Sequence, residues 1–118
     1  MSTMLASPFS ELRKQCRALL RSAVARAFSD LPVPHIVLDL PPNPQFGDLT
    51  SSICFELAKQ LHKSPREIAE QIGAEAQAEL SAFPLIESVK VEGQGYINFY
   101  ANLAELSRLT LTTAEDLD

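Results

Sequence analysis

The sequence has 118 residues, of which 46% are hydrophobic and 21% are charged, and its formal net charge is −5 at pH 7. This composition is typical of one folded domain with a modest core, and it excludes a largely disordered chain. No apolar run approaches the roughly 20 residues needed to cross a bilayer, so we expect no membrane partner. The start of the chain lacks the features of a secretory signal, and we expect a cytoplasmic protein.

The charge is unevenly distributed along the chain. Through residue 28 there are five basic residues and one acidic residue, whereas the remainder has five basic and fourteen acidic residues. Tight binding through phosphates requires many basic side chains that displace the counterions of the nucleic acid. Because this domain is acidic overall, it cannot bind nucleic acid tightly through phosphates alone. Any nucleic-acid contact must therefore be local and made mostly to bases.

The first predicted element is a helix. Ser7 and Pro8 are typical of an N-cap followed by the first helical position. Apolar residues then recur at three- and four-residue steps, which predicts a buried stripe on a helix of about five turns. The stripe consists of Phe9, Leu12, Cys16, Leu19, Leu20, Ala23, Val24, Ala27 and Phe28. Arg13, Arg17 and Arg21 recur on another face, which is either a solvated surface or a row of phosphate or partner contacts.

A strand is predicted next, after a proline-containing linker. Residues 35–40 are rich in branched side chains. Ile36, Leu38 and Leu40 alternate along this segment, so all three are expected to face the core.

The loop at residues 43–49, with the sequence Asn-Pro-Gln-Phe-Gly-Asp-Leu, is the first candidate site. Prolines restrict the backbone in and just before this loop, and they are Pro41, Pro42 and Pro44. Because a stiffened loop loses little freedom on binding, we interpret Asn43 and Phe46 as a candidate recognition tip. The alternative is that Phe46 folds back onto the core.

Two further helices are predicted after the loop. Gly47 permits a sharp turn, and Asp48 is predicted to cap the second helix. The buried stripe of that helix is expected to contain Leu49, Ile53, Leu57, Ala58 and Leu61. Residues 64–67, Ser-Pro-Arg-Glu, form a capping box that predicts the start of a third helix. Its buried face is expected to contain Ile68, Ala69, Ile72, Ala76 and Leu80.

A β-hairpin is predicted from two alternating segments, residues 86–92 and 96–100, on either side of a Gly-Gln-Gly turn. Ile97 and Phe99 are expected to face the core. A short helical segment at residues 103–111 closes the chain.

The opposite face of this hairpin is the second candidate site. Tyr96, Asn98 and Tyr100 are expected to point there, because side chains alternate along a strand. An aromatic ring and an amide two residues apart can stack on a base and hydrogen-bond its edge. The alternative is that helices cover this face and the tyrosines only pack.

Together the elements predict an α+β fold in the order α-β-α-α-β-β-α. Helices are expected to pack on a mainly antiparallel sheet of three to four strands. We expect a single domain over residues 1–118, with its core at about residues 8–101.

The sequence predicts no metal site and no catalytic residues. Cys16 and Cys54 lie at helical positions among apolar neighbours, without a partner His or Cys at ligand spacing. They are expected to be small buried residues in a reducing compartment, rather than disulfide or metal ligands. The Gly-x-Gly at Gly93 precedes a strand and not a helix, so no phosphate loop is predicted.

Four motifs in this order resemble a known family. They are the loop at residues 43–49, Leu57-Ala58-Lys59, Ser64-Pro65-Arg66-Glu67-Ile68-Ala69, and the stretch from Val89 to Phe99 that ends in Gly-Tyr-Ile-Asn-Phe. Over roughly residues 9–101 the chain resembles the N-terminal additional domain of arginyl-tRNA synthetase.

The resemblance implies an α+β domain that contacts an exposed D-loop nucleotide at the outer corner of tRNA. In the family, the contact comes from the Asn-x-x-Phe-Gly loop and from an aromatic-x-Asn pair on the last strand. It therefore implies tRNA contacts by Asn43, Phe46, Tyr96 and Asn98, provided that the loop and the hairpin form one shallow pocket. Asp48 is also among the implied tRNA-binding residues. It stands where some members have glutamine, and because a carboxylate only accepts hydrogen bonds, we favour a helix-cap role for it.

The resemblance also implies an ATP-dependent arginine–tRNA ligase as the parent enzyme, with no cofactor in this domain itself. Neither the His-x-Gly-His nor the Lys-Met-Ser-Lys signature of the ATP site occurs in the sequence. We therefore expect an excised domain or natural fragment that does not activate arginine. Its expected partners are tRNA, bound weakly in isolation, and the rest of the synthetase. Two alternatives stay open: a protein–protein module that uses the same aromatic residues, and a buttress without tRNA contact.

Overall fold

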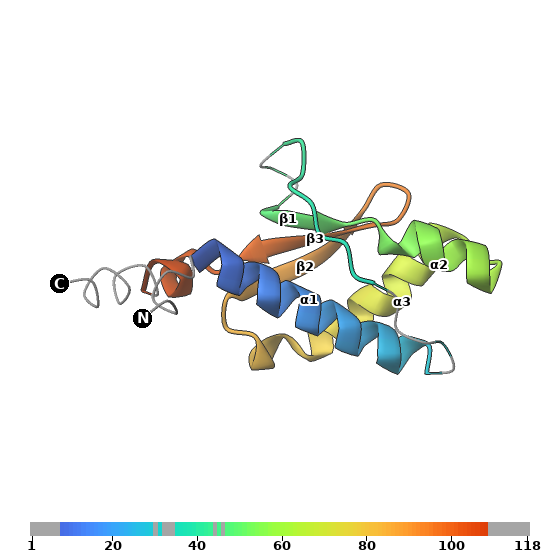
Figure 1. The fold of residues 1–118 in the computed structure, drawn as a ribbon, viewed down its shortest axis with the longest axis horizontal. Coiled ribbons are helices and arrows are strands. Elements are labelled where there is room, and N and C mark those ends of the chain that lie inside the picture. The colour runs from blue at the N-terminus through green and yellow to red at the C-terminus, as the bar shows by residue number, and fades with distance from the viewer. Residues whose placement is uncertain (1–7, 30, 32–34, 44, 46, 109–118) are drawn as a thin grey trace.

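The computed structural model describes residues 8–29, 31, 35–43, 45 and 47–108 (Figure 1). In chain order the elements are α1 (Pro8–Ala27), β1 (Leu49–Ser51), α2 (Ile53–Leu61), α3 (Pro65–Ala78), the 3-10 helix η3 (Leu80–Ala82), β2 (Ile86–Glu92) and β3 (Tyr96–Ala101). Residues 103–108 are again helical. The α+β class is confirmed, and the order of helices and strands matches the prediction except that the first strand lies at Leu49–Ser51 and not at residues 35–40. Over the described residues, the helices are too short or too polar to cross a membrane.

The three strands form an antiparallel sheet in the order β1-β3-β2, so β3 is the central strand. Phe99 of β3 pairs with Leu49 on one side and with Val89 on the other. Ile97 and Phe99 are fully buried, as predicted. Helices α1 and α3 pack against each other on this core side of the sheet (Figure 1).

The apolar stripe of α1 is buried as its spacing predicts. Its fully buried members, each no more than 1% exposed, are Leu12, Cys16, Leu19, Leu20, Ala23 and Val24. Cys16 and Cys54 are both free and buried, which confirms their prediction as small core residues. Burial raises the pKa of each thiol to about 12, so both stay protonated and unreactive at neutral pH.

Helix α3 begins where the capping motif predicts. The Ser64 Oγ accepts a hydrogen bond of 3.1 Å from the backbone N–H of Glu67, and proline follows at the first helical position. Its predicted buried residues Ile68, Ala69, Ile72 and Ala76 are all fully buried. Leu80 lies in η3 and is partly buried against the core. The cap predicted for α1 at Ser7 lies outside the described residues.

Residues 35–40 do not form the predicted strand. They run beside β1 and make one isolated bridge, in which Asp39 and Thr50 exchange backbone hydrogen bonds of 2.9 and 2.8 Å. Ile36 and Leu38 are buried as expected, but Leu40 is 66% exposed, so its predicted core position is wrong. The pairing with β1 cannot continue beyond Leu40 because Pro41 and Pro42 follow, and prolines have no N–H to donate.

Candidate functional site

The face of the sheet opposite α1 and α3 carries polar and aromatic side chains. Along β3, Tyr96 is 44% exposed, whereas the next residue, Ile97, is fully buried. The strand register places Thr50 of β1 and Lys90 of β2 on either side of Asn98. The predicted alternation along the hairpin is therefore confirmed, and Tyr96 on the outer face stays partly open to solvent.

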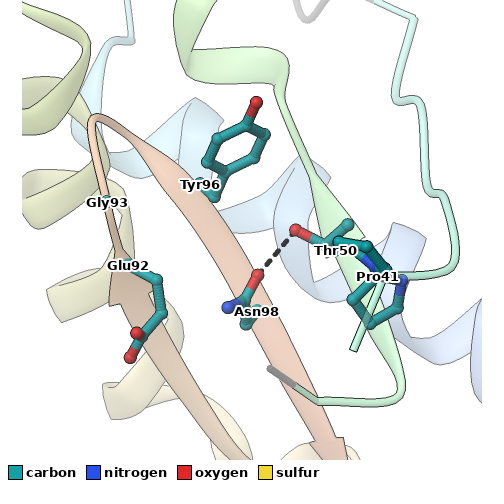
Figure 2. A pocket seen from close by; sticks show the side chains of 7 residues that line it. Pro41, Thr50, Glu92, Gly93, Tyr96 and Asn98 are labelled. Atoms are coloured by element: carbon teal, nitrogen blue, oxygen red, sulfur yellow. Dashed lines mark hydrogen bonds between the residues drawn. The ribbon is translucent and has the colours of Figure 1, made fainter. Parts of the chain in front are cut away.

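A pocket of about 330 Å³ opens on this face near the hairpin turn. The described residues that line it are Pro41, Pro42, Thr50, Glu92, Gly93, Tyr96 and Asn98. Figure 2 shows Tyr96 and Asn98 rising from the central strand, with Thr50 and Pro41 on one side of them and Glu92 on the other. A volume of this size is at the lower end of the range for small-ligand pockets, which begins at about 300 Å³. The prolines before the loop and the polar face of the hairpin thus share one cavity.

Asn98 is held in a defined orientation in this pocket. The residue is 3% exposed, and its Oδ1 accepts a hydrogen bond of 2.6 Å from the Thr50 hydroxyl. Within the described part of the chain, the amide Nδ2 has no hydrogen-bond partner. The side chain can therefore donate to a ligand without breaking its bond to Thr50.

Tyr96 supplies the aromatic surface of the pocket. Its ring meets Phe55 of α2 edge-on, with a centroid distance of 5.1 Å and an interplanar angle of 61°. This contact steadies the ring and leaves it partly open to solvent, because an edge-on neighbour does not cover both faces.

The loop that carries Asn43 is fastened to the central strand. The Asn43 Oδ1 accepts a hydrogen bond of 3.1 Å from the Gln45 N–H, and the Gln45 carbonyl accepts one of 3.0 Å from the Tyr100 hydroxyl. Partial burial raises the pKa of Tyr100, and the carboxylates of Glu92 and Asp48 raise it further, so the hydroxyl remains a donor at neutral pH. Asn43 itself is not among the described residues that line the pocket. Phe46, the other half of the predicted tip, lies outside the described residues.

Asp48 does not cap α2, so that prediction is wrong. Its Oδ2 accepts a hydrogen bond of 2.8 Å from the Ala101 N–H, and its own N–H donates one of 2.8 Å to the Phe99 carbonyl. Strand β1 intervenes, and α2 begins only at Ile53. The carboxylate therefore ties the loop to the end of β3, a long-range role that local cap signals do not reveal.

Replacing Asp48 with alanine is expected to lower the free energy of unfolding by about 1–2 kcal/mol, because the N–H of the largely buried Ala101 loses its acceptor. Urea unfolding monitored by circular dichroism measures this loss. Asp39→Ala is the matched control, because Asp39 is exposed and its bridge uses only backbone atoms. Equal urea midpoints for the two variants would contradict a stabilising hydrogen bond between the Asp48 carboxylate and the Ala101 N–H.

The arginine row of α1 is not part of the pocket. The Arg13 Nη1 donates a hydrogen bond of 2.9 Å to the Leu38 carbonyl, and its guanidinium lies 5.6 Å from the centroid of the Phe9 ring. Arg17 and Arg21 lie further along the same helix, on the core side of the sheet. Arg13 thus holds residues 35–40 against α1, and the proposed phosphate contacts of all three arginines stay a prediction.

Three side chains on the outer face were not assigned a role from sequence: Thr50, Lys90 and Glu92. The alternation of residues 88–92 signals that Lys90 and Glu92 point outward, but not what lies beside them. Thr50 carries no signal, because its strand has only three residues. In the described part of the chain, no cluster of three His, Cys, Asp or Glu side chains is placed to hold a metal ion.

Sequence comparison relates this chain to one family. The sequence model of the family described as "Arginyl tRNA synthetase N terminal domain" matches residues 14–101. The chain is 40% identical over 77 residues to an arginine–tRNA ligase of Thermococcus sibiricus, covering 65% of this chain and 12% of that protein. It is 32% identical over 108 residues to the arginine–tRNA ligase of Methanothermobacter thermautotrophicus, covering 92% of this chain and 18% of that protein.

Two solved structures share the fold. The arginyl-tRNA synthetase of Thermus thermophilus matches with a TM-score of 0.56 and 30% identity, over 78% of this chain and 15% of that chain. The arginyl-tRNA synthetase of Plasmodium falciparum matches with a TM-score of 0.68 and 14% identity, over 81% of this chain and 17% of that chain. The chain thus spans 12–18% of the length of these four relatives.

Proposed function

The chain belongs to the arginyl-tRNA synthetase N-terminal domain family, and on this premise we propose that it binds an unpaired nucleotide of the tRNA D-loop. The observation that carries the proposal is the shared pocket, in which Tyr96 and Asn98 lie together with Pro41 and Pro42. In this proposal the Tyr96 ring stacks on the base, and the Asn98 amide hydrogen-bonds the edge of the base.

The pocket is suited to this role because its key side chains are already ordered. Phe55 steadies the Tyr96 ring, and the Thr50 hydroxyl orients the Asn98 amide. A base that enters the pocket therefore meets groups that lose little freedom on binding. A neutral base is also the appropriate ligand here, because the Glu92 carboxylate in the pocket lining repels a phosphate.

Asn43 and Phe46 are proposed to contact the nucleotide next to the one in the pocket. The support is the attachment of their loop to β3 through Gln45 and Tyr100, which holds the loop beside the outer face of the sheet. Asp48 acts in this proposal as a structural tether and not as a base contact.

We further propose that the parent enzyme is an arginine–tRNA ligase that joins arginine to tRNA with ATP. The domain needs no cofactor of its own for recognition. Its contact is weak in isolation because the chain is acidic, with a net charge of −5. Attachment to other tRNA-contacting domains would raise the effective concentration of the D-loop at this site.

The test is a titration of the isotope-labelled chain with an unmodified transcript of an arginine tRNA at low salt. We expect chemical-shift changes at Thr50, Tyr96 and Asn98, together with nuclease protection of D-loop nucleotides. The matched control is the same transcript with its D-loop shortened to a stable tetraloop, which should leave these resonances unchanged. An absence of specific shifts with the intact transcript would favour a protein–protein module or a structural buttress instead.

A further inference from the structure

We propose that Lys90 is the phosphate-binding residue of this surface. It receives a backbone phosphate of a single RNA strand that runs from the pocket toward the loop of Asn43 and Gln45. The inference rests on the proposed function and extends it, because it assigns the charged contact to β2 and not to the arginine row of α1.

The strand register places Lys90 beside the pocket. Lys90 pairs directly with Asn98, so the two side chains leave the same face of the sheet as nearest cross-strand neighbours. The Cβ atoms of such a pair are about 4.5–5.5 Å apart, and the lysine stem is long enough to follow a nucleotide whose base contacts Asn98.

The Lys90 ammonium also lies beside the residue that attaches the loop to β3. Its Nζ is 5.2 Å from the centroid of the Tyr100 ring, and the Tyr100 hydroxyl is hydrogen-bonded to the Gln45 carbonyl. The side chain therefore extends along the sheet from Asn98 toward Tyr100, the residue to which the loop is attached. An RNA strand that touches both the pocket and the loop can then place a phosphate within reach of this ammonium.

Lys90 is available for an anion. The residue is exposed, and none of the ion pairs among the described residues includes it. The contact with the Tyr100 ring leaves the ammonium protons free to bind phosphate oxygens, since the ring attracts the cation without accepting a directional hydrogen bond.

The alternative cations are less well placed. Arg13 already donates to the Leu38 carbonyl, and Arg17 and Arg21 lie on the helix layer behind the sheet. A nucleotide whose base occupies the pocket is separated from that layer by the sheet itself (Figure 2). Lys90 is on the same side as the base.

The salt dependence of tRNA binding tests this assignment. The affinity of the unaltered chain and of Lys90→Ala for an arginine tRNA transcript is measured across a series of KCl concentrations. Loss of one phosphate contact to an unpaired strand is expected to make the slope of log K against log salt shallower by about 0.7. The two proteins should therefore differ at low salt and converge at high salt. Lys90→Arg should retain the slope of the unaltered chain.

Lys63→Ala is the matched control, because Lys63 is also an exposed lysine whose Nζ lies over an aromatic ring, 5.8 Å from the centroid of Phe28, and it is not among the predicted contacts. We expect its slope to equal that of the unaltered chain. An unchanged slope for Lys90→Ala, or an equal change for Lys63→Ala, overturns the assignment of Lys90. If Tyr96→Ala still weakens binding in that case, the proposed function stands without it. Failure of the unaltered chain to bind the transcript at low salt overturns both the assignment of Lys90 and the proposed function.

Discussion

Replacing Tyr96 with alanine is expected to weaken binding of an arginine tRNA transcript by about 1–3 kcal/mol, which corresponds to roughly a 5- to 150-fold rise in Kd. The loss arises because the aromatic face on which a base would stack is removed from the pocket. Folding should be preserved, since Tyr96 is 44% exposed and its ring meets the ring of Phe55 only edge-on. Fluorescence anisotropy with a labelled transcript at low salt measures the change.

Two controls separate stacking from a general surface effect. Tyr96→Phe keeps the ring and should retain the affinity of the unaltered chain to within about twofold. Val37→Ala removes an apolar side chain that is also 44% exposed but is not among the described residues that line the pocket, and it should leave the Kd unchanged. Equal Kd values for Tyr96→Ala and Val37→Ala would show that the pocket does not bind the base.

Replacing Gly47 with alanine is expected to lower the free energy of unfolding by about 1–3 kcal/mol. The backbone of Gly47 has a φ of +102°, which side-chain-bearing residues rarely adopt. In addition, a Cβ at this position would lie 2.7 Å from the carbonyl oxygen of Phe99. That oxygen belongs to the central strand and accepts the Asp48 N–H, so it cannot move without loosening the attachment of the loop. Urea unfolding followed by circular dichroism measures the loss.

Gly93→Ala is the matched comparison for Gly47→Ala. Gly93 also has a positive φ, of +58°, but a Cβ there would meet its nearest neighbour, a ring carbon of Tyr96, at an ordinary 3.7 Å. Alanine at this position therefore meets only the cost of a positive φ, without a steric clash. We expect a smaller decrease in the free energy of unfolding, of about 1 kcal/mol. If Gly47→Ala destabilised the fold no more than Gly93→Ala, close packing of the loop against β3 would not contribute.

Helices and strands that are determined by residues close together in the sequence could be predicted from it. The spacing of Leu12, Cys16 and Leu19 was sufficient to predict the buried face of α1, and the capping motif at Ser64 was sufficient to predict where α3 begins. The alternation along β3 correctly separated Tyr96 and Asn98 from the core, because side chains on a strand have a fixed period of two.

Elements that depend on distant partners could not be predicted. Strand β1 has three residues, too few to show any period, and Leu49 suits the buried face of a helix as well as that of a strand. Asp48 has the composition and position of a helix cap, but its partner is the Ala101 N–H, 53 residues away along the chain. Long-range hydrogen bonds of this kind leave no local pattern to detect.

The candidate site lies between these two cases. Tyr96 and Asn98 were predicted as a pair on one face, and the structure brings them together with Pro41 and Pro42 in one pocket. Thr50 could not be found in advance, because its contact with Asn98 exists only when β1 pairs with β3.

The attachment of the loop to the central strand also bears on synthesis at the ribosome. Gln45 and Asp48 hold their positions through Tyr100, Phe99 and Ala101, which are made more than 50 residues later. A nascent chain that has emerged only as far as α3 therefore has helices to pack but nothing to which the loop can be fixed. The pocket is completed in the same step that adds the last strand to the sheet, so a chain truncated before β3 would lack the pocket altogether.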